Sequence, residues 1–204
     1  MDALVMCGGR GTRLDGETEK PLVDVAGEPM VDRVLAALAD SRVESAYAVV
    51  SPQAPETRAH VEGGVPLVET PGEGYVADLR RALDDSRVDR PVLTVAADLP
   101  LLDGEVVDRV LDAHDDGSLT AAVPTERKRE LGVSVDTTFE GAGQELAPAG
   151  VNVVGGSGDD DSDDVDGAGS GADGGMLVVD DARLAVNLNR PPDRGVAERL
   201  LGNG

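Results

Sequence analysis

The 204-residue sequence contains very little cysteine, aromatic side chain or lysine. Its single cysteine, Cys7, excludes an intramolecular disulfide. Tryptophan is absent, and the aromatic residues are only Tyr47, Tyr75 and Phe139. No apolar run approaches the roughly 20 residues of a membrane-spanning helix, and the N-terminus lacks a signal-peptide pattern. We therefore expect a cytoplasmic protein without a membrane partner, folded as one domain over residues 1–204.

Positive charge is also scarce. Eighteen basic residues stand against 40 acidic ones, which gives a formal net charge of −22. Because duplex nucleic acids are bound by neutralising their phosphates, this charge argues strongly against a nucleic-acid partner. Sixteen basic residues are arginine, and only Lys20 and Lys128 are lysine. This composition is typical of proteins from a very salty cytoplasm, where ionic strength screens self-repulsion, so we expect unfolding at low salt.

Short apolar runs alternate with segments of helical spacing along most of the chain. Strands are predicted at residues 3–6, 45–50, 65–69, 91–97, 119–123, 150–154, 176–179 and 184–188. Helices are predicted at residues 30–38, 55–61, 75–83 and 106–114, with a closing helix after Pro191-Pro192. This alternation predicts an α/β fold: one Rossmann-like, three-layer domain around a mostly parallel sheet. Ligands of such sheets lie beyond the carboxyl ends of the strands.

One segment breaks the alternation. Residues 155–175 contain eight glycines, seven aspartates and no basic residue. Such a segment cannot bury enough apolar surface to offset the entropy of ordering it, so we predict a disordered acidic loop. The alternative is an ion-binding repeat, but the aspartate spacing does not match an EF-hand.

A glycine-rich segment, Gly-Gly-Arg-Gly-Thr-Arg at residues 8–13, directly follows the first predicted strand. Its backbone N–H groups can converge on an anion. No Gly-Lys-Ser/Thr follows as in a Walker A loop, and Leu14 replaces the third glycine of a dinucleotide fingerprint. Arg10, Arg13 and Lys20 surround the segment with positive charge, which favours a phosphate-binding loop over a plain turn. In an arginine-rich chain, Lys20 indicates a compact point charge at a phosphate.

Asp98 follows the most apolar predicted strand, where an α/β sheet presents its site. A carboxylate there is suited to hold Mg²⁺ on a triphosphate. Capping of the following helix is the alternative, although Asp103 is the better cap. Asn187 and Asn189 alternate on one face of a predicted strand end, where a ligand or metal-bound water would satisfy their amides; a turn is the alternative.

Three further residue types receive no catalytic role from the residues alone. Lys128 lies in a charged run at residues 126–129, and a solvated turn is favoured there over binding of an acceptor phosphate. Cys7 is interpreted as a packed small residue rather than a nucleophile. His60 and His114 have no serine or cysteine partner in a recognisable motif.

Together these motifs resemble a known family. The glycine loop with Lys20-Pro21, Asp98 after the fourth strand and Asn187-x-Asn189 resemble the nucleotide-diphospho-sugar transferase fold of molybdenum-cofactor guanylyltransferases and sugar-phosphate nucleotidylyltransferases. Residues 1–13, 19–22, 51–57, 72–75 and 148–154 resemble archaeal GTP:adenosylcobinamide-phosphate guanylyltransferases (CobY), within the MobA-like superfamily. The likeness fails at residues 155–175, an insertion, and at Arg190, where the family usually has a threonine-type residue.

The resemblance implies transfer of GMP from GTP to adenosylcobinamide phosphate, with Mg²⁺ as cofactor. It implies catalytic roles for Arg13, Lys20 and Asp98, with Asp98 as the metal ligand and Asn187 and Asn189 near the acceptor or metal. The implied nucleotide contacts are Met6, Cys7, Gly8, Gly9, Arg10, Gly11, Thr12, Arg13, Lys20, Ser51, Thr70 and Gly74. Transfer to a molybdopterin or sugar phosphate, and a non-catalytic nucleotide-binding regulator, remain alternatives. The sequence does not determine whether the chain forms a homodimer.

Overall fold

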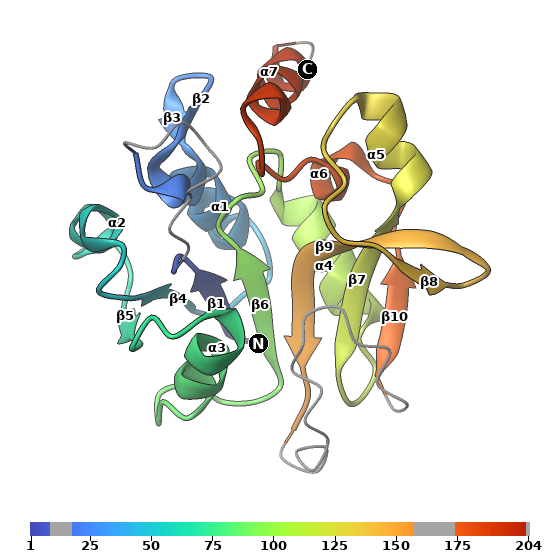
Figure 1. Cartoon of the computed structure of the whole chain (residues 1–204). Helices are drawn as coiled ribbons and strands as arrows, with labels where there is room; N and C mark the ends of the chain where they lie inside the picture. Colours follow the sequence, from blue (N-terminus) through green and yellow to red (C-terminus); the bar gives the residue numbers. More distant parts are fainter. Residues whose placement is uncertain (9–17, 157–173, 203–204) are drawn as a thin grey trace.

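The computed structural model describes residues 1–8, 18–156 and 174–202, which form an α/β fold around one large sheet (Figure 1). Its strands are β1 (Ala3–Met6), β4 (Ala46–Val50), β5 (Leu67–Glu69), β6 (Val92–Ala96), β7 (Leu119–Pro124), β8 (Phe139–Gly141), β9 (Gln144–Val154) and β10 (Gly175–Val178). The helices are η1 (Lys20–Leu22), α1 (Met30–Ala39), α2 (Pro55–Val61), α3 (Tyr75–Leu83), α4 (Gly104–Ala113), α5 (Thr125–Leu131), α6 (Ala182–Ala185) and α7 (Pro191–Leu201). Within these described ranges, no helix is long and apolar enough to cross a membrane.

The sheet has the strand order β10-β7-β9-β6-β1-β4-β5, and β8 pairs with β9. β5, β4, β1 and β6 are parallel neighbours, as are β7 and β10, so the predicted mostly parallel sheet is confirmed. β9 is the exception, because it runs antiparallel to both β6 and β7. Met6 lies opposite Val49 of β4 and Ala96 of β6, so the chain leaves these three strands at one edge of the sheet.

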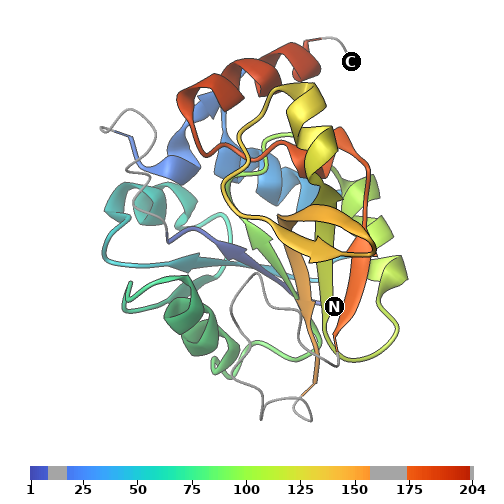
Figure 2. The same ribbon diagram turned by 45° about the vertical axis from the view of Figure 1, so that its right-hand side comes forward.

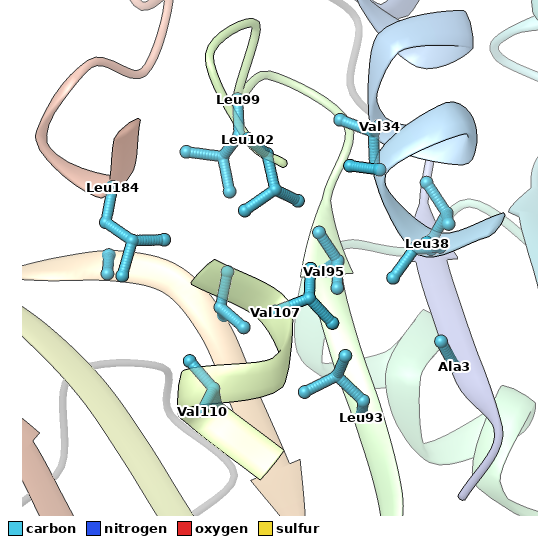
Figure 3. Close-up of a cluster of buried hydrophobic side chains, with 14 of the residues drawn as sticks. Ala3, Val34, Leu38, Leu93, Val95, Leu99, Leu102, Val107, Val110 and Leu184 are labelled. Carbon is cyan, nitrogen blue, oxygen red and sulfur yellow. The ribbon is translucent and has the colours of Figure 1, made fainter. Parts of the chain in front are cut away.

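Alternation along β1 explains the three layers. Ala3 and Val5 pack into the core on the side of α1 and α4, whereas Leu4 and Met6 pack on the side of α3. Because successive side chains of a strand point to opposite faces, an all-apolar strand is buried on both. Figure 2 shows α3 across the sheet from α1. Figure 3 shows the α1 and α4 side, where Val34, Leu38, Val107 and Val110 meet Leu93 and Val95 of β6.

Beyond the main sheet, the structure corrects several predicted elements. The expected strand at residues 184–188 is the short helix α6 followed by an extended segment, because Asp181 caps the helix by accepting the Arg183 N–H at 2.9 Å. A short apolar run does not distinguish these conformations by periodicity. The charged run at residues 126–129 lies in α5, which ends at Gly132 with φ +79°. β2 (Asp24–Val25), β3 (Glu28–Pro29) and β8 were not predicted, and β9 begins at Gln144 rather than at residue 150.

The predicted acidic loop at residues 155–175 lies mostly outside the described residues, but both of its ends are described. The Gly155 N–H donates to Ser118 Oγ at 3.1 Å, and the Gly175 N–H donates to the Ser118 carbonyl at 2.7 Å. Gly175 is already part of β10, so the predicted loop is too long at this end. A Cβ on Gly155 would come within 2.4 Å of the Gly117 backbone, so this close approach requires glycine.

Candidate active site

The candidate site lies at the sheet edge where β1, β4 and β6 end. The chain leaves β1 through Cys7 and Gly8, and it leaves β6 through Ala97 and Asp98. A cavity of about 550 Å³ lies at this edge. Its described lining consists of Met6, Gly8, Lys20, Pro21, Val49, Tyr75, Asp78, Ala96, Ala97 and Asp98. We call it the first cavity.

Three predicted site residues from distant parts of the chain meet in this region. Lys20, at the start of η1, places its Nζ 2.5 Å from Asp98 Oδ2 and 2.8 Å from Asn189 Oδ1. The Leu188 N–H donates to the Asp98 carbonyl at 3.0 Å, which fixes the asparagine segment beside the end of β6. The side chains of Lys20 and Asp98 are only 20% and 14% exposed. This partial burial strengthens their attraction relative to a pair in water.

Glu19 holds the backbone that carries Lys20. Its two carboxylate oxygens accept the N–H groups of Glu56 and Thr57 at 2.9 and 2.6 Å, at the start of α2. Those N–H groups have no partner within the helix, and a carboxylate there also suits the helix dipole. The position of Lys20 is therefore set by α2 as well as by its own ion pair, a role of Glu19 that spacing in the sequence did not indicate.

Asp78 is a second carboxylate of the first cavity that the sequence analysis missed. It lies in α3, is 3% exposed, and accepts the Gly72 N–H at 2.8 Å through Oδ1. A Cβ on Gly8 would lie 3.5 Å from Asp78 Oδ2. Helical spacing predicts the buried face of α3, and an aspartate on that face was the available signal, since buried carboxylates are rare without partners.

A second cavity, of about 450 Å³, adjoins the first, because Tyr75 and Ala96 line both. Most of its remaining lining is polar. These residues are Val76, Lys128, Ser134, Asp136, Thr137, Ala147, Pro148, Gly150, Asn152, Asn187 and Asn189. The two asparagines therefore lie in one cavity, although the segment that carries them is not a strand.

Lys128 is buried rather than part of a solvated turn, so the favoured sequence interpretation was wrong. Its side chain points inward from α5, the residue is 2% exposed, and Nζ donates to the Ala185 carbonyl at 2.7 Å and to Asn187 Oδ1 at 2.6 Å. Burial lowers the pKa of Lys128, and nearby carboxylates oppose this shift in part. The charged neighbours of Lys128 in the sequence hid the buried position, because α5 has no apolar stripe.

Each lysine of the chain thus binds one of the two asparagines. Lys20 binds Asn189 in the region of the first cavity, and Lys128 binds Asn187 at the second. Because only Leu188 separates the asparagines, this short segment connects the two cavities. The composition of sixteen arginines and two lysines therefore has a structural counterpart, because both lysine ammonium groups lie at the candidate site.

Asp193 holds the backbone of the asparagine segment in place through hydrogen bonds. It is 1% exposed and accepts four hydrogen bonds, from the N–H and Oγ of Ser134 and from the backbone N–H groups of Asn189 and Arg190. The donor distances lie between 2.7 and 3.0 Å. A buried carboxylate with several donors is well satisfied, so Asp193 joins the start of α7 to the wall of the second cavity.

The other predicted nucleotide contacts fall into two groups. Gly9, Arg10, Gly11, Thr12 and Arg13 lie outside the described residues. Met6 and Gly8 line the first cavity, whereas Cys7, Ser51, Thr70 and Gly74 are not part of its described lining.

Among that second group, Ser51 and Thr70 are buried, and the Thr70 hydroxyl donates to the Val50 carbonyl at 3.2 Å, which is a structural role. Gly74 precedes α3 with φ +121°. Burial raises the pKa of the Cys7 thiol to about 12, in keeping with a packed residue rather than a nucleophile. Asp103, not Asp98, caps α4 by accepting the Val106 N–H at 2.9 Å, as predicted.

The donor atoms beside the first cavity suit a hard cation. The Asp98 carboxylate and the Asn189 amide oxygen both lie within hydrogen-bonding distance of one point, the Lys20 ammonium. Mg²⁺ takes one or two protein oxygens and completes its shell with phosphate oxygens and water. Among the described residues, no group of three histidine, cysteine or carboxylate side chains could hold a metal ion alone. The described donor atoms therefore fit a cation shared with a phosphate ligand.

Comparison with known proteins identifies the family of this chain. Residues 3–185 match the family model of the MobA-like NTP transferase domain. The chain is 29% identical over 213 residues to the adenosylcobinamide-phosphate guanylyltransferase of Methanocaldococcus jannaschii, covering 98% of this chain and 97% of that protein. A shorter stretch, 26% of this chain, is 38% identical to the bifunctional protein GlmU of Methanococcus maripaludis and covers 13% of it.

Solved structures show the same fold. A hypothetical transferase from Thermus thermophilus is similar with a TM-score of 0.57 and 25% identity, over 76% of this chain and 64% of that one, just under two thirds of its length. A putative glucose-1-phosphate thymidylyltransferase from Bacillus anthracis has a TM-score of 0.56 at 14% identity. The match covers 76% of this chain and 71% of that one, and it supports the fold alone. Fold and site together define a nucleotidyltransferase. The chain belongs to the MobA-like NTP transferase domain family.

Proposed function

We propose that this protein transfers GMP from GTP to adenosylcobinamide phosphate, releasing pyrophosphate. The observation that carries nucleotidyl transfer is the cluster in which Lys20 Nζ contacts Asp98 and Asn189 at the carboxyl edge of the sheet. The choice of base and acceptor is supported by the full-length similarity to the Methanocaldococcus jannaschii guanylyltransferase.

The proposed reaction needs little acid–base chemistry from the protein. An oxygen of the acceptor phosphate forms a bond to the α-phosphorus of GTP, while the bond from that phosphorus to the oxygen bridging toward the β-phosphorus breaks. Pyrophosphate leaves with the electron pair of the broken bond. A phosphate monoester is largely ionised near neutral pH, so its oxygen needs no general base. Catalysis then depends on alignment and on charge stabilisation.

Lys20 is the described residue best placed to stabilise the leaving pyrophosphate. Its ammonium lies in the lining of the first cavity, and Glu19 and Asp98 hold it there. We assign Arg13 the same task on the basis of its position in the glycine-rich segment. Residues 8–13 would contact the triphosphate with their backbone N–H groups.

Asp98 would hold Mg²⁺, with the Asn189 amide oxygen beside it. When bound, the ion would neutralise negative charge on the phosphate oxygens. Asp78 and Asp98 add two carboxylates to a cavity that would also contain a triphosphate. Lys20 alone does not balance this charge, which supports a cation in addition to the basic side chains.

A pyrophosphate-release assay in concentrated KCl tests the proposal. The protein is offered adenosylcobinamide phosphate with each of the four nucleoside triphosphates, and a molybdopterin or sugar phosphate replaces the acceptor in parallel reactions. We expect release with GTP and adenosylcobinamide phosphate only. Release with another acceptor would assign the chain to a different transferase, and GTP binding without release under any condition would indicate a regulator.

Two variants show whether release comes from this site. Asp98→Asn keeps the shape of the side chain but removes its charge, so release should fall by about 100-fold or more. Asp112→Asn removes one charge from the exposed surface of α4 and should leave release unchanged. Equal activity in the two variants would place the chemistry elsewhere.

A further inference from the structure

The second cavity contains a buried positive charge whose hydrogen-bond partners are neutral. Lys128 is 2% exposed, and its ammonium donates to a backbone carbonyl and to the Asn187 amide oxygen. In the part of the chain that the structure describes, Lys128 forms no ion pair, whereas Lys20 pairs with Asp98. A buried ammonium without an anionic partner is unfavourable, and its third N–H donor is available to a ligand.

The carboxylates around this cavity are largely occupied by other groups. Asp193, Asp98 and Asp136 are the three whose charges act on Lys128. Asp193 accepts four hydrogen bonds from other groups, Asp98 pairs with Lys20, and Asp136 pairs with Arg190 at 2.5 Å. Burial still lowers the pKa of Lys128, so these charges do not fully offset its desolvation.

The position of the second cavity relates it to the first. Tyr75 and Ala96 line both cavities, and the segment from Asn187 to Asn189 joins Lys128 to Lys20. A ligand at Lys128 would therefore lie beside a nucleotide in the first cavity. The remaining polar lining adds no further positive charge: Asn152 and Thr137 are neutral, and the Asp136 carboxylate pairs with Arg190.

We propose that the second cavity is the acceptor's binding site and that Lys128 binds its phosphate monoester. This inference rests on the proposed function, because it takes the acceptor to be a phosphate that attacks GTP. A cavity of about 450 Å³ holds part of a drug-sized ligand. It accommodates the phosphate and the linker that carries it, and the corrin ring remains outside.

Binding of the acceptor without nucleotide tests this site directly. Equilibrium dialysis of adenosylcobinamide phosphate, followed by the visible absorbance of the corrin, is compared for the wild type, Lys128→Met and Arg129→Met. Lys128→Met keeps length and removes charge, whereas Arg129→Met removes a charge one residue away, where the side chain is 59% exposed and pairs with Glu145. We expect the first variant to weaken acceptor binding by about tenfold to 100-fold and the control to leave it within about twofold.

GTP affinity and thermal unfolding are measured for the same variants, to separate a loss of acceptor binding from misfolding and from a loss of GTP binding. A folded Lys128→Met protein with normal GTP affinity and weak acceptor binding supports the site. If Lys128→Met does not fold, Thr137→Phe provides the second variant, because it fills an exposed part of the cavity wall and leaves Lys128 in place. Unchanged acceptor binding in the folded variant, or in Thr137→Phe when Lys128→Met is unfolded, overturns the inference.

Inorganic phosphate distinguishes this inference from the proposed function. If the wild type transfers no GMP to adenosylcobinamide phosphate, the proposed acceptor is wrong, but the anion site is still measurable. Phosphate is titrated by calorimetry into protein saturated with GTP, so that the nucleotide occupies the first cavity. Binding that is lost in Lys128→Met and retained in Arg129→Met supports an anion site, and no binding to the wild type overturns it.

Discussion

Lys20 Nζ lies 2.5 Å from Asp98 Oδ2, although 78 positions separate the two residues in the sequence. One comes from the segment after the glycine-rich loop and the other from the end of β6. Neither is fully buried, and both line the first cavity. Their pairing depends on the parallel order of β1 and β6, which brings the ends of these strands together.

Replacing Lys20 should therefore affect turnover more than GTP binding. Lys20→Met should lower kcat by about 100- to 1000-fold, because it removes a positive charge aimed at developing negative charge. Lys20→Arg should recover little of this loss, since a planar guanidinium does not reproduce a compact ammonium between Asp98 and Asn189. Steady-state kinetics with varied GTP distinguish the effects: near-normal kcat with raised KM would make Lys20 only a ground-state anchor.

Asp193 should act as a positioning residue. Asp193→Asn replaces one acceptor oxygen by an NH₂ group that faces donors from Ser134, Asn189 and Arg190. We expect a loss of about 2–4 kcal/mol in the free energy of unfolding, together with lower kcat. Glu198→Gln, which breaks an exposed pair with Arg194, should cost less than about 1 kcal/mol. Denaturant unfolding measures the free energy of unfolding of both variants, and equal decreases in the two would contradict the role of Asp193.

Replacing Gly104 and Gly195 by alanine should have opposite effects on the stability of the protein. A Cβ on Gly104 would come within 2.5 Å of the Asp40 carbonyl oxygen, so α1 and α4 would have to separate, and Gly104→Ala should destabilise by about 1–3 kcal/mol. Gly195 lies inside α7 with nothing within 4 Å of such an atom, so Gly195→Ala should stabilise by about 0.5–1 kcal/mol. Thermal unfolding of the pair checks both signs, and a shared sign would contradict the predicted packing.

The buried thiol of Cys7 should make stability depend on alkaline pH. Its pKa is raised by burial to about 12 from a reference value of 9.0, so the folded state retains the proton and the unfolded state releases it first. The free energy of unfolding should fall as pH rises above the reference pKa of 9.0, by about 1.4 kcal/mol per pH unit, until the thiol ionises in the folded state. The wild type should therefore lose more stability than Cys7→Ala between pH 9 and pH 11; parallel pH profiles would show that Cys7 does not contribute.

The net charge of −22 leads to a prediction about salt. Between about 0.1 and 1 M KCl the Debye length falls from about 10 to about 3 Å, which screens repulsion between like charges. Screening also weakens the exposed ion pairs, but each of these contributes little. The melting temperature should therefore rise with KCl, and an uncharged osmolyte at matched osmolality serves as the control. A melting temperature independent of KCl would contradict salt adaptation.

Much of the fold could be predicted because its central strands are apolar on both faces and its helices are amphipathic. α2 (Pro55–Val61) and α3 (Tyr75–Leu83) begin and end where their spacing indicated. β9 was predicted too short, since Pro148 and Gly150 interrupt its pattern, and nothing local in the sequence indicated its antiparallel direction.

The candidate site could be predicted only in part. Lys20, Asp98 and Asn189 carry local signals, namely an isolated lysine, a carboxylate at a strand end and paired asparagines. Lys128 and Asp193 acquire their roles from tertiary contacts. A charged residue in a short polar helix such as α5 has no periodicity that distinguishes burial from exposure, and nothing local to α7 indicates the contact of Asp193 with Ser134, so the structure was needed to find them.

Ser118 binds both Gly155 and Gly175, and this contact affects how the acidic segment can vary in length. The chain leaves and returns at one residue, directly before the start of β7, opposite the edge where β1 and β6 present the candidate site. The distance to be bridged is thus independent of the number of residues between, and the entropy of closing a loop grows only with the logarithm of its length. Insertions and deletions can therefore accumulate here at little thermodynamic cost, so that surface charge can change while the edge with the candidate site stays the same.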